Sequence, residues 1–210
     1  MTERHQGKEC CDMRIIGLTG GIGTGKSTIL RIMEKECGAY VVETDKLAHQ
    51  LMRQGEMAYQ RILEHFGTGI LDDQKEIDRA KLGSLVFADE KELQSLNQIV
   101  HPAVKEYILA DIDSKKKEGK VAFYVIEAAL LIEDGYKEIC DELWYIYVNR
   151  AKRLKRLVAG RGGTVEKYEK VIENQATEDF YKKNCDVVID NEESVENTAN
   201  IVKQLLFSPR

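Results

Sequence analysis

The chain has 210 residues, of which 43% are hydrophobic and 32% are charged, and its formal net charge is -5. This length fits one globular domain, or a core that carries a smaller insertion, and the composition is that of a folded protein rather than a disordered or membrane protein. The negative charge argues against a general nucleic-acid binder, because binding to the phosphate backbone depends on clustered positive charge.

The N-terminal segment, residues 1–12, is polar and contains no apolar stretch of the kind found in signal peptides. No part of the chain approaches the roughly 18 consecutive apolar residues that a membrane helix needs. The five cysteines lack C-x-x-C spacing, which indicates neither a disulfide framework nor a zinc site. We therefore expect a cytoplasmic protein without membrane partners, in which residues 1–12 are a flexible extension without a catalytic role.

The first predicted elements are a strand, a glycine-rich loop and a helix. The apolar run from Arg14 to Thr19 predicts a buried strand, and helical spacing of apolar residues follows from Ser27 to Cys37. Residues 40–42 predict a second strand. From Asp45 to Phe66 the pattern indicates helices that are interrupted at residues 54–55.

The middle of the chain is expected to be helical. A polar, turn-rich connection spans residues 67–82, and amphipathic stretches follow at residues 82–87 and 93–112. Residues 115–120 are mostly charged and predict a turn before the next strand.

The last third returns to alternating strands and helices. Residues 121–126 and 143–148 are rich in β-branched and aromatic side chains, which is typical of buried parallel strands. A short strand at residues 187–189 and a helix near residues 194–206 complete the pattern. We predict an α/β fold with a doubly wound parallel sheet.

The loop after the first strand carries the complete phosphate-binding motif G-x-x-x-x-G-K-[ST]. Backbone N–H groups and the helix N-terminus would cradle a polyphosphate, Lys26 would neutralise the β- and γ-phosphates, and Ser27 would ligate Mg²⁺. The alternative is a glycine-rich turn with a solvated lysine. No N-K-x-D element for reading guanine is present, so ATP is the expected nucleotide. The residues expected to bind it in this loop are Gly20, Gly21, Gly23, Thr24, Gly25, Lys26, Ser27 and Thr28.

Two acidic side chains follow predicted strands. Asp45 stands where a carboxylate could accept the proton of an attacking hydroxyl, or it could cap the following helix together with Glu43 and Thr44; the pattern alone favours neither. Glu127 could support Mg²⁺, or it could be an exposed loop carboxylate.

Six cations cluster between Asn149 and Arg161, and a glycine pair follows them at Gly162 and Gly163. A basic helix that ends in glycines is what a mobile lid over phosphates would look like, although some of these cations must simply be solvated. We expect Arg156 and Arg161 to stabilise transition-state charge. We also expect Thr164 to cap the next helix.

Several blocks in order make this chain similar to the dephospho-CoA kinase family. They are GLTGGIGTGKST, IDRAKLGSLVF, LNQIVHP, ALLIE and CDVVIDN. The resemblance implies an ATP- and Mg²⁺-dependent transfer of phosphate to the 3′-hydroxyl of dephospho-CoA, the last step of coenzyme A synthesis. It also implies that Asp45 lies beside the acceptor hydroxyl and that Arg79 and His101 contact the acceptor or support its domain; on pattern alone, His101 could equally be a packed or solvated side chain at the start of a helix.

The same resemblance implies a division of the chain. The P-loop core would comprise residues 13–45 and 120–205, a helical acceptor-binding insertion would span about 55–115, a lid would span about 150–175, and residues 206–210 would be a tail. Substrates would be ATP and dephospho-CoA, with no nucleic-acid partner, and protein partners stay open.

Some positions depart from the family pattern, notably Glu43, Glu127, Ala129 and Gly162. These departures concern metal support and lid geometry. They leave open a nucleotide-binding regulator without catalysis. A kinase for a nucleoside, nucleotide or shikimate-like metabolite shares the same phosphate cradle and is the other main alternative, whereas a motor ATPase is disfavoured because a second set of motor motifs is lacking.

Overall fold

A computed structural model describes residues 13–208, so the expectation for residues 1–12 and for the last two residues of the tail lies outside the described part. The strands are β1 (Arg14–Thr19), β2 (Tyr40–Glu43), β3 (Phe123–Glu127), β4 (Glu142–Tyr147) and β5 (Val187–Asp190). The α-helices are α1 (Lys26–Cys37), α2 (Thr44–Leu51), α3 (Tyr59–Phe66), α4 (Arg79–Ala88), α5 (Glu90–Glu118), α6 (Arg150–Arg161), α7 (Val165–Glu173), α8 (Glu178–Asn184) and α9 (Val195–Phe207).

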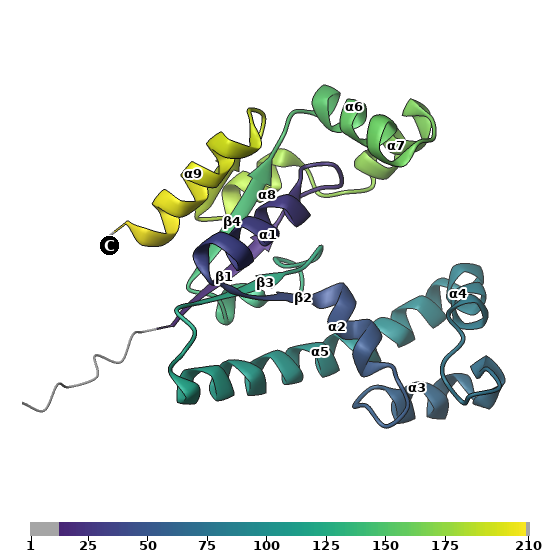
Figure 1. Ribbon diagram of the computed structural model, residues 1–210. Coiled ribbons are helices and arrows are strands. Elements are labelled where there is room, and N and C mark those ends of the chain that lie inside the picture. Colours follow the sequence, from purple (N-terminus) through teal and green to yellow (C-terminus); the bar gives the residue numbers. More distant parts are fainter. Residues whose placement is uncertain (1–12, 209–210) are drawn as a thin grey trace, which may run out of the picture. The chain divides into compact units, whose positions relative to one another are not determined.

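The strands form one sheet in the order β2-β3-β1-β4-β5. β1 pairs in parallel with both β3 and β4, and β4 pairs in parallel with β5. Because parallel strands need crossover connections, helices separate them along the chain, as Figure 1 shows. The prediction of a doubly wound α/β sheet is confirmed.

The main core lies between the sheet and helices α1 and α9. Ile16, Val125 and Trp144 of the central strands are fully buried there together with Met33 of α1 and Val202 of α9. Apolar residues of α1 recur at helical spacing, so one face of this helix is buried while the opposite face carries charges. This packing fixes the direction in which α1 leaves the loop after β1.

Aromatic side chains pack where α8 contacts β4. The rings of Tyr145 and Tyr181 are stacked, with centroids 4.7 Å apart and planes within 11° of parallel. Both side chains are buried, and burial raises the pKa of Tyr145 to about 12. The contact places α8 and the segment before it against the P-loop end of the sheet.

The chain divides into two compact units. Within the described residues, the first comprises residues 13–41 and 114–208, and the second comprises residues 42–113. The predicted boundaries lay at residue 45 and at about 55 and 115–120. Most of α2 lies in the interval that the prediction left unassigned, and the structure places this helix in the helical unit.

The structure differs from three local interpretations of the sequence. Lys115, Lys116 and Lys117 lie in the last turns of α5, where their positive charge is favourable at the helix C-terminus. His101, for which a position at a helix start was one interpretation, lies inside α5. Leu206 belongs to α9, in agreement with the helix predicted near residues 194–206, but Phe207, which we expected in the tail, also belongs to it.

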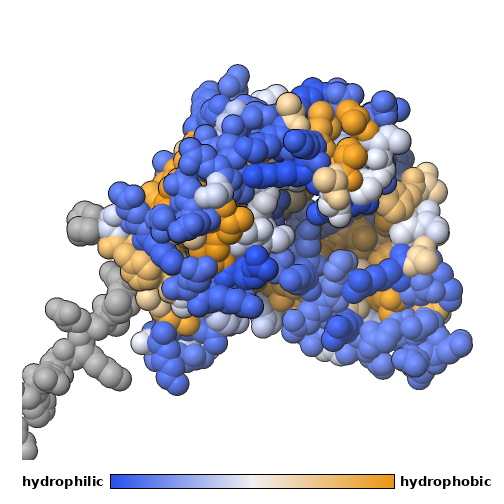
Figure 2. Space-filling view, turned by 45° about the horizontal axis from the view of Figure 1, so that its top comes forward, coloured by the Kyte–Doolittle hydropathy of each residue, from blue (hydrophilic) through white to orange (hydrophobic). Residues whose placement is uncertain are grey.

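The surface is mainly hydrophilic in the view of Figure 2, with smaller hydrophobic patches between the polar residues. Phe87 is the most exposed of the large hydrophobic side chains in the described residues, at 92%. Between residues 13 and 208, no helix is long and apolar enough to cross a membrane.

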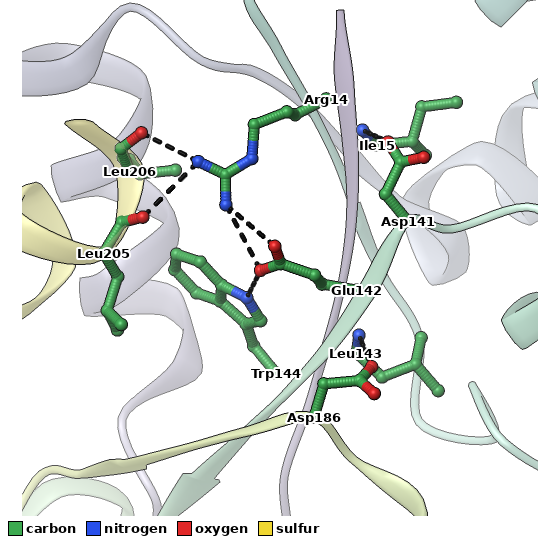
Figure 3. A network of polar contacts seen from close by, with 9 residues as sticks. All are labelled: Arg14, Ile15, Asp141, Glu142, Leu143, Trp144, Asp186, Leu205 and Leu206. Carbon is green, nitrogen blue, oxygen red and sulfur yellow. Dashed lines mark hydrogen bonds and ion pairs between the residues drawn. The ribbon is translucent and has the colours of Figure 1, made fainter. Parts of the chain in front are cut away.

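Acidic side chains bind the amino-terminal ends of the strands together (Figure 3). Asp141 accepts the N–H of Ile15 at 2.7 Å, and Asp186 accepts the N–H of Leu143 at 2.8 Å. Asp141, which precedes β4, thus binds the start of β1, and Asp186, which precedes β5, binds the start of β4.

Glu142 is the centre of the same network. It accepts hydrogen bonds from Arg14 Nη2 at 3.1 and 3.2 Å and from Trp144 Nε1 at 2.8 Å. Arg14 also donates to the carbonyl of Leu206 at 2.8 Å, which joins the end of α9 to β1.

Replacing Glu142 by Ala should lower the free energy of unfolding by about 1–3 kcal/mol, because the indole N–H of Trp144 and part of the Arg14 guanidinium would lose their acceptor while still buried. Urea denaturation measures this change. Glu34→Ala, at an exposed position of α1, is the control and should change the same quantity by less than about 0.5 kcal/mol. Equal effects of the two substitutions would contradict a structural role for the network.

Candidate active site

The loop between β1 and α1 has a backbone that only glycine adopts easily. Gly23 and Gly25 have φ values of 81° and 91°, and Gly25 is the N-cap residue of α1. The loop therefore delivers the chain into the helix with the first N–H groups of α1 at its mouth. Such a helix N-terminus, with its partial positive charge, is suited to bind a phosphate.

Asn191, which directly follows β5, supports this loop from the protein interior. Its Nδ2 donates to the carbonyl of Thr24 at 2.7 Å, and its Oδ1 accepts the hydroxyl of Thr198 at 2.7 Å. A Cβ atom on Gly25 would lie 2.5 Å from the same Nδ2. We did not predict a site role for Asn191; its signals in the sequence were its position after a predicted strand and its place in the block CDVVIDN.

Lys26 lies at the start of α1 and points back across the loop. Its Nζ donates to the carbonyl of Gly20 at 2.7 Å and lies 3.7 Å from Glu127 Oε1. The side chain of Glu127 is only 13% exposed. The interpretation of Glu127 as an exposed loop carboxylate is therefore wrong, and an acid at the end of β3 pairs with the P-loop lysine.

A pocket of about 420 Å³ opens over the loop. Its lining combines the P-loop with the end of α6 and with the segment around α8. These residues are Gly20, Gly21, Ile22, Gly23, Gly25, Lys26, Ser27, Ala129, Arg156, Leu157, Gly160, Arg161, Gln175 and Tyr181.

Two predicted nucleotide ligands do not line this pocket. Thr24 is fully buried and donates its hydroxyl to the carbonyl of Gly21 at 2.9 Å, so it stabilises the loop. Thr28 lies within α1, and its N–H is bonded to the carbonyl of Gly25 at 3.0 Å.

The two predicted lid arginines both line the pocket, in different ways. Arg156 Nη2 donates to the carbonyl of Asn191 at 2.8 Å, so this guanidinium is anchored beside the loop. Arg161 is exposed at the end of α6, where Gly162 terminates the helix with a φ of 67°. The side chain of Thr164 then caps α7 by accepting the N–H of Lys167 at 3.3 Å, as predicted.

Asp45 lies in the helical unit, in the first turn of α2, and is exposed. Within the described residues, the N-cap Glu43 makes no side-chain capping hydrogen bond; its carboxylate instead lies 2.6 Å from Lys46 Nζ. Glu43 therefore occupies the N-cap position, as the capping alternative has it, but does not cap the helix through its side chain. Asp45 is an acidic residue in the first turn of α2, so its interpretations as part of the helix cap and as a proton acceptor both stay open.

The helical unit has a pocket of its own, with a volume of about 350 Å³. Arg79, the first residue of α4, lines it together with His49, Met52, Arg53, Glu76 and Ile77. Two arginines and a histidine make it suitable for an anionic ligand. His101 does not line this pocket and is half-buried in α5.

The comparisons with known proteins agree on one family. The family model for dephospho-CoA kinase matches residues 14–197. Dephospho-CoA kinase of Carboxydothermus hydrogenoformans is 38% identical over 192 residues, which cover 91% of this chain and 92% of the relative. The enzyme of Geobacillus kaustophilus is 40% identical over 183 residues, or 87% and 90% of the two chains.

Solved structures give the same result. Dephospho-CoA kinase from Campylobacter jejuni superposes with a TM-score of 0.69 at 26% identity and covers 91% of this chain and 94% of its own. A shikimate kinase from Bacteroides thetaiotaomicron reaches a TM-score of 0.52 at 15% identity, over 92% and 98% of the chains. The similarity to shikimate kinase concerns the fold alone.

The close contact at Gly25 predicts a loss of nucleotide binding in Gly25→Ala. The added methyl group would meet Asn191 and force the loop out of a left-handed conformation, so ATP affinity should fall by at least about tenfold. Isothermal titration calorimetry measures the affinity.

Gly38→Ala provides the matched control. Gly38 caps the other end of α1 with a φ of 68°, and open space surrounds its Cα. This variant should lose about 1 kcal/mol of stability and bind ATP normally. Normal ATP binding by Gly25→Ala would contradict the role of the loop conformation.

Proposed function

The chain belongs to the dephospho-CoA kinase family, and we propose that its P-loop unit binds Mg²⁺·ATP while its helical unit binds the acceptor and supplies Asp45 as the base. As a dephospho-CoA kinase, it transfers the terminal phosphate of ATP to the 3′-hydroxyl of dephospho-CoA, giving CoA and ADP in the last step of CoA biosynthesis. The observation that carries the residue roles is the P-loop itself, with Lys26 held between Gly20 and Glu127 at the phosphate pocket.

In the proposed reaction, the acceptor oxygen forms a bond to the γ-phosphorus while the bond to the β,γ-bridging oxygen breaks. The bonding electrons leave with ADP, and the hydroxyl proton passes to the Asp45 carboxylate. Asp45 suits this task because its carboxylate is exposed in the first turn of α2. The chain contributes positioning and charge rather than covalent chemistry.

Positive charge around the phosphates comes from Lys26 and the lid arginines. We assign Lys26 to the β- and γ-phosphates, since it lines the pocket over the loop. Arg161 is the arginine assigned to the transferring group, because it is exposed at a glycine-terminated helix end and can move. Arg156 is anchored on Asn191 and would act as a fixed charge beside the loop.

The residues at this site fit a magnesium ion. Ser27 offers a hydroxyl oxygen and Glu127 a carboxylate, and such hard oxygen donors suit Mg²⁺. Among residues 13–208, no group of three or more His, Cys, Asp or Glu side chains forms a metal cage. Mg²⁺ is commonly held by one or two protein groups together with substrate phosphates, and it neutralises phosphate charge when bound.

The acceptor is assigned to the helical unit. The pocket lined by Arg53 and Arg79 offers two guanidinium groups for the phosphates of dephospho-CoA. His101 does not line that pocket, so we propose a supporting role for it within α5. The substrates are small molecules, and we propose the cytoplasm as the location, without nucleic-acid or membrane partners.

A coupled ADP-release assay tests this function. ATP and Mg²⁺ are supplied with dephospho-CoA, adenosine, AMP, shikimate or no acceptor, and the product is identified by mass. Release that depends on dephospho-CoA and yields CoA is the expected result. Release with another acceptor alone, or none despite ATP binding, would contradict it.

Asp45→Asn should lower kcat by about 10²–10⁴-fold, because the amide cannot accept the hydroxyl proton, while the Kd for ATP stays within about twofold. Steady-state kinetics and calorimetry provide the two readings. Asp73→Asn, at another exposed position of the helical unit, is the control and should keep full turnover. Unchanged turnover in Asp45→Asn would remove this carboxylate from the mechanism.

A further inference from the structure

One cation of α6 is unlike the others in that cluster. Arg153 is only 6% exposed and lies beneath the P-loop. Its Nε donates to the carbonyl of Ile22 at 2.9 Å, and its Nη2 donates to Gln175 Oε1 at 2.7 Å. The same Gln175 oxygen accepts the N–H of Ile22 at 3.0 Å. Arg153 and Gln175 together form a closed ring of hydrogen bonds around Ile22, which we call the Ile22 clamp.

The Ile22 clamp fixes the peptide groups on both sides of one loop residue. Ile22 contributes its N–H on one side and its carbonyl on the other, between Gly21 and Gly23. A Cβ atom on Gly21 would lie 2.2 Å from Arg153 Nη2 and 2.7 Å from Gln175 Oε1. The absence of a side chain at Gly21 is therefore what allows the guanidinium to approach the loop backbone.

Arg153 is poorly placed to act as a phosphate ligand itself. It does not line the pocket over the loop, whereas Gln175 and Arg161 do. Its Nε and Nη2 are directed at neutral oxygens of the protein. Burial lowers the pKa of its guanidinium below the ordinary value, which reflects the cost of keeping a charge in this position. The nearby carboxylate of Glu178 favours the charged guanidinium, but Nε and Nη2 form their hydrogen bonds with the loop carbonyl and with Gln175.

We propose that Arg153 and Gln175 are positioning residues that hold the peptide groups of Ile22 so that the P-loop keeps its phosphate-binding shape. Gln175 follows the last turn of α7, so the clamp also ties the end of the proposed lid segment to the loop. This inference rests on the proposed function only in that ATP is the ligand of the pocket. Turnover of dephospho-CoA is not needed to test it.

The test compares ATP affinity in folded variants. Arg153→Met, Arg153→Lys, Gln175→Leu and the double variant Arg153→Met with Gln175→Leu are titrated with Mg²⁺·ATP by calorimetry, without acceptor. Lys155→Met is the matched control, because Lys155 lies on the same helix and is exposed. Melting curves establish that each variant is folded.

Arg153→Met should raise the Kd for ATP about tenfold, since two hydrogen bonds to a charged group are lost. Gln175→Leu should raise it by about threefold to tenfold because the N–H of Ile22 loses its acceptor, and the double variant should be no worse than Arg153→Met, because both changes break one ring. The control should stay within about twofold. Arg153→Lys should remain weakened, since an ammonium cannot reproduce the planar, two-point contact.

Kinetics separate a positioning effect from general damage. The KM for ATP should rise with its Kd in the variants, while the KM for dephospho-CoA stays within about twofold. If Arg153→Met does not fold, the ATP affinity of Gln175→Leu alone tests the proposal. A folded Gln175→Leu variant with unchanged ATP affinity, or full affinity in Arg153→Lys, would overturn the proposal. If the unmodified chain binds ATP but does not turn over dephospho-CoA, the proposed function is contradicted. The ATP titrations of the variants would still test the Ile22 clamp.

Discussion

The conformation of the P-loop is the constraint on which the rest of the site depends. A loop that exposes N–H groups to phosphate cannot use them to hold itself together, so other groups must fix its backbone. Here the carbonyl of Thr24 is bonded by Asn191, the carbonyl of Gly20 by Lys26, and Ile22 by Arg153 and Gln175. The parallel sheet serves this end, since it places the residues that follow β4 and β5 next to the residues that follow β1.

The positive charge of the phosphate pocket contrasts with the negative net charge of the whole chain. The chain carries a net charge of -5, yet the pocket over the loop is lined by Lys26, Arg156 and Arg161. Each cation is held differently: Lys26 between a carbonyl and Glu127, Arg156 on the carbonyl of Asn191, and Arg161 at an exposed helix end. Lys26 and Arg156 are already oriented and need little rearrangement when phosphate charge develops, whereas Arg161 would move into place.

The sequence predicted the sheet, the P-loop and the order of elements because these depend on local patterns. β1 and the motif ending in Lys26 and Ser27 follow from apolar runs and from fixed spacing. The supports of the loop could not be predicted in the same way: Arg153 and Ile22 are separated by 131 positions, and Asn191 and Thr24 by 167. The alternative that put His101 at a helix start depended on the preference of proline for the first turn of a helix, but α5 continues through Pro102.

The central claim is that the protein itself, rather than the nucleotide, organises the P-loop. Amide hydrogen exchange of Ile22, measured by NMR in the protein without nucleotide, tests it most directly. The N–H of Ile22 donates to Gln175, so we expect its exchange to be at least about 100-fold slower than in an unstructured peptide and to change little when ATP is added. Exchange at the unstructured rate that becomes slow only with ATP would contradict the account, because the ligand would then be what orders the loop.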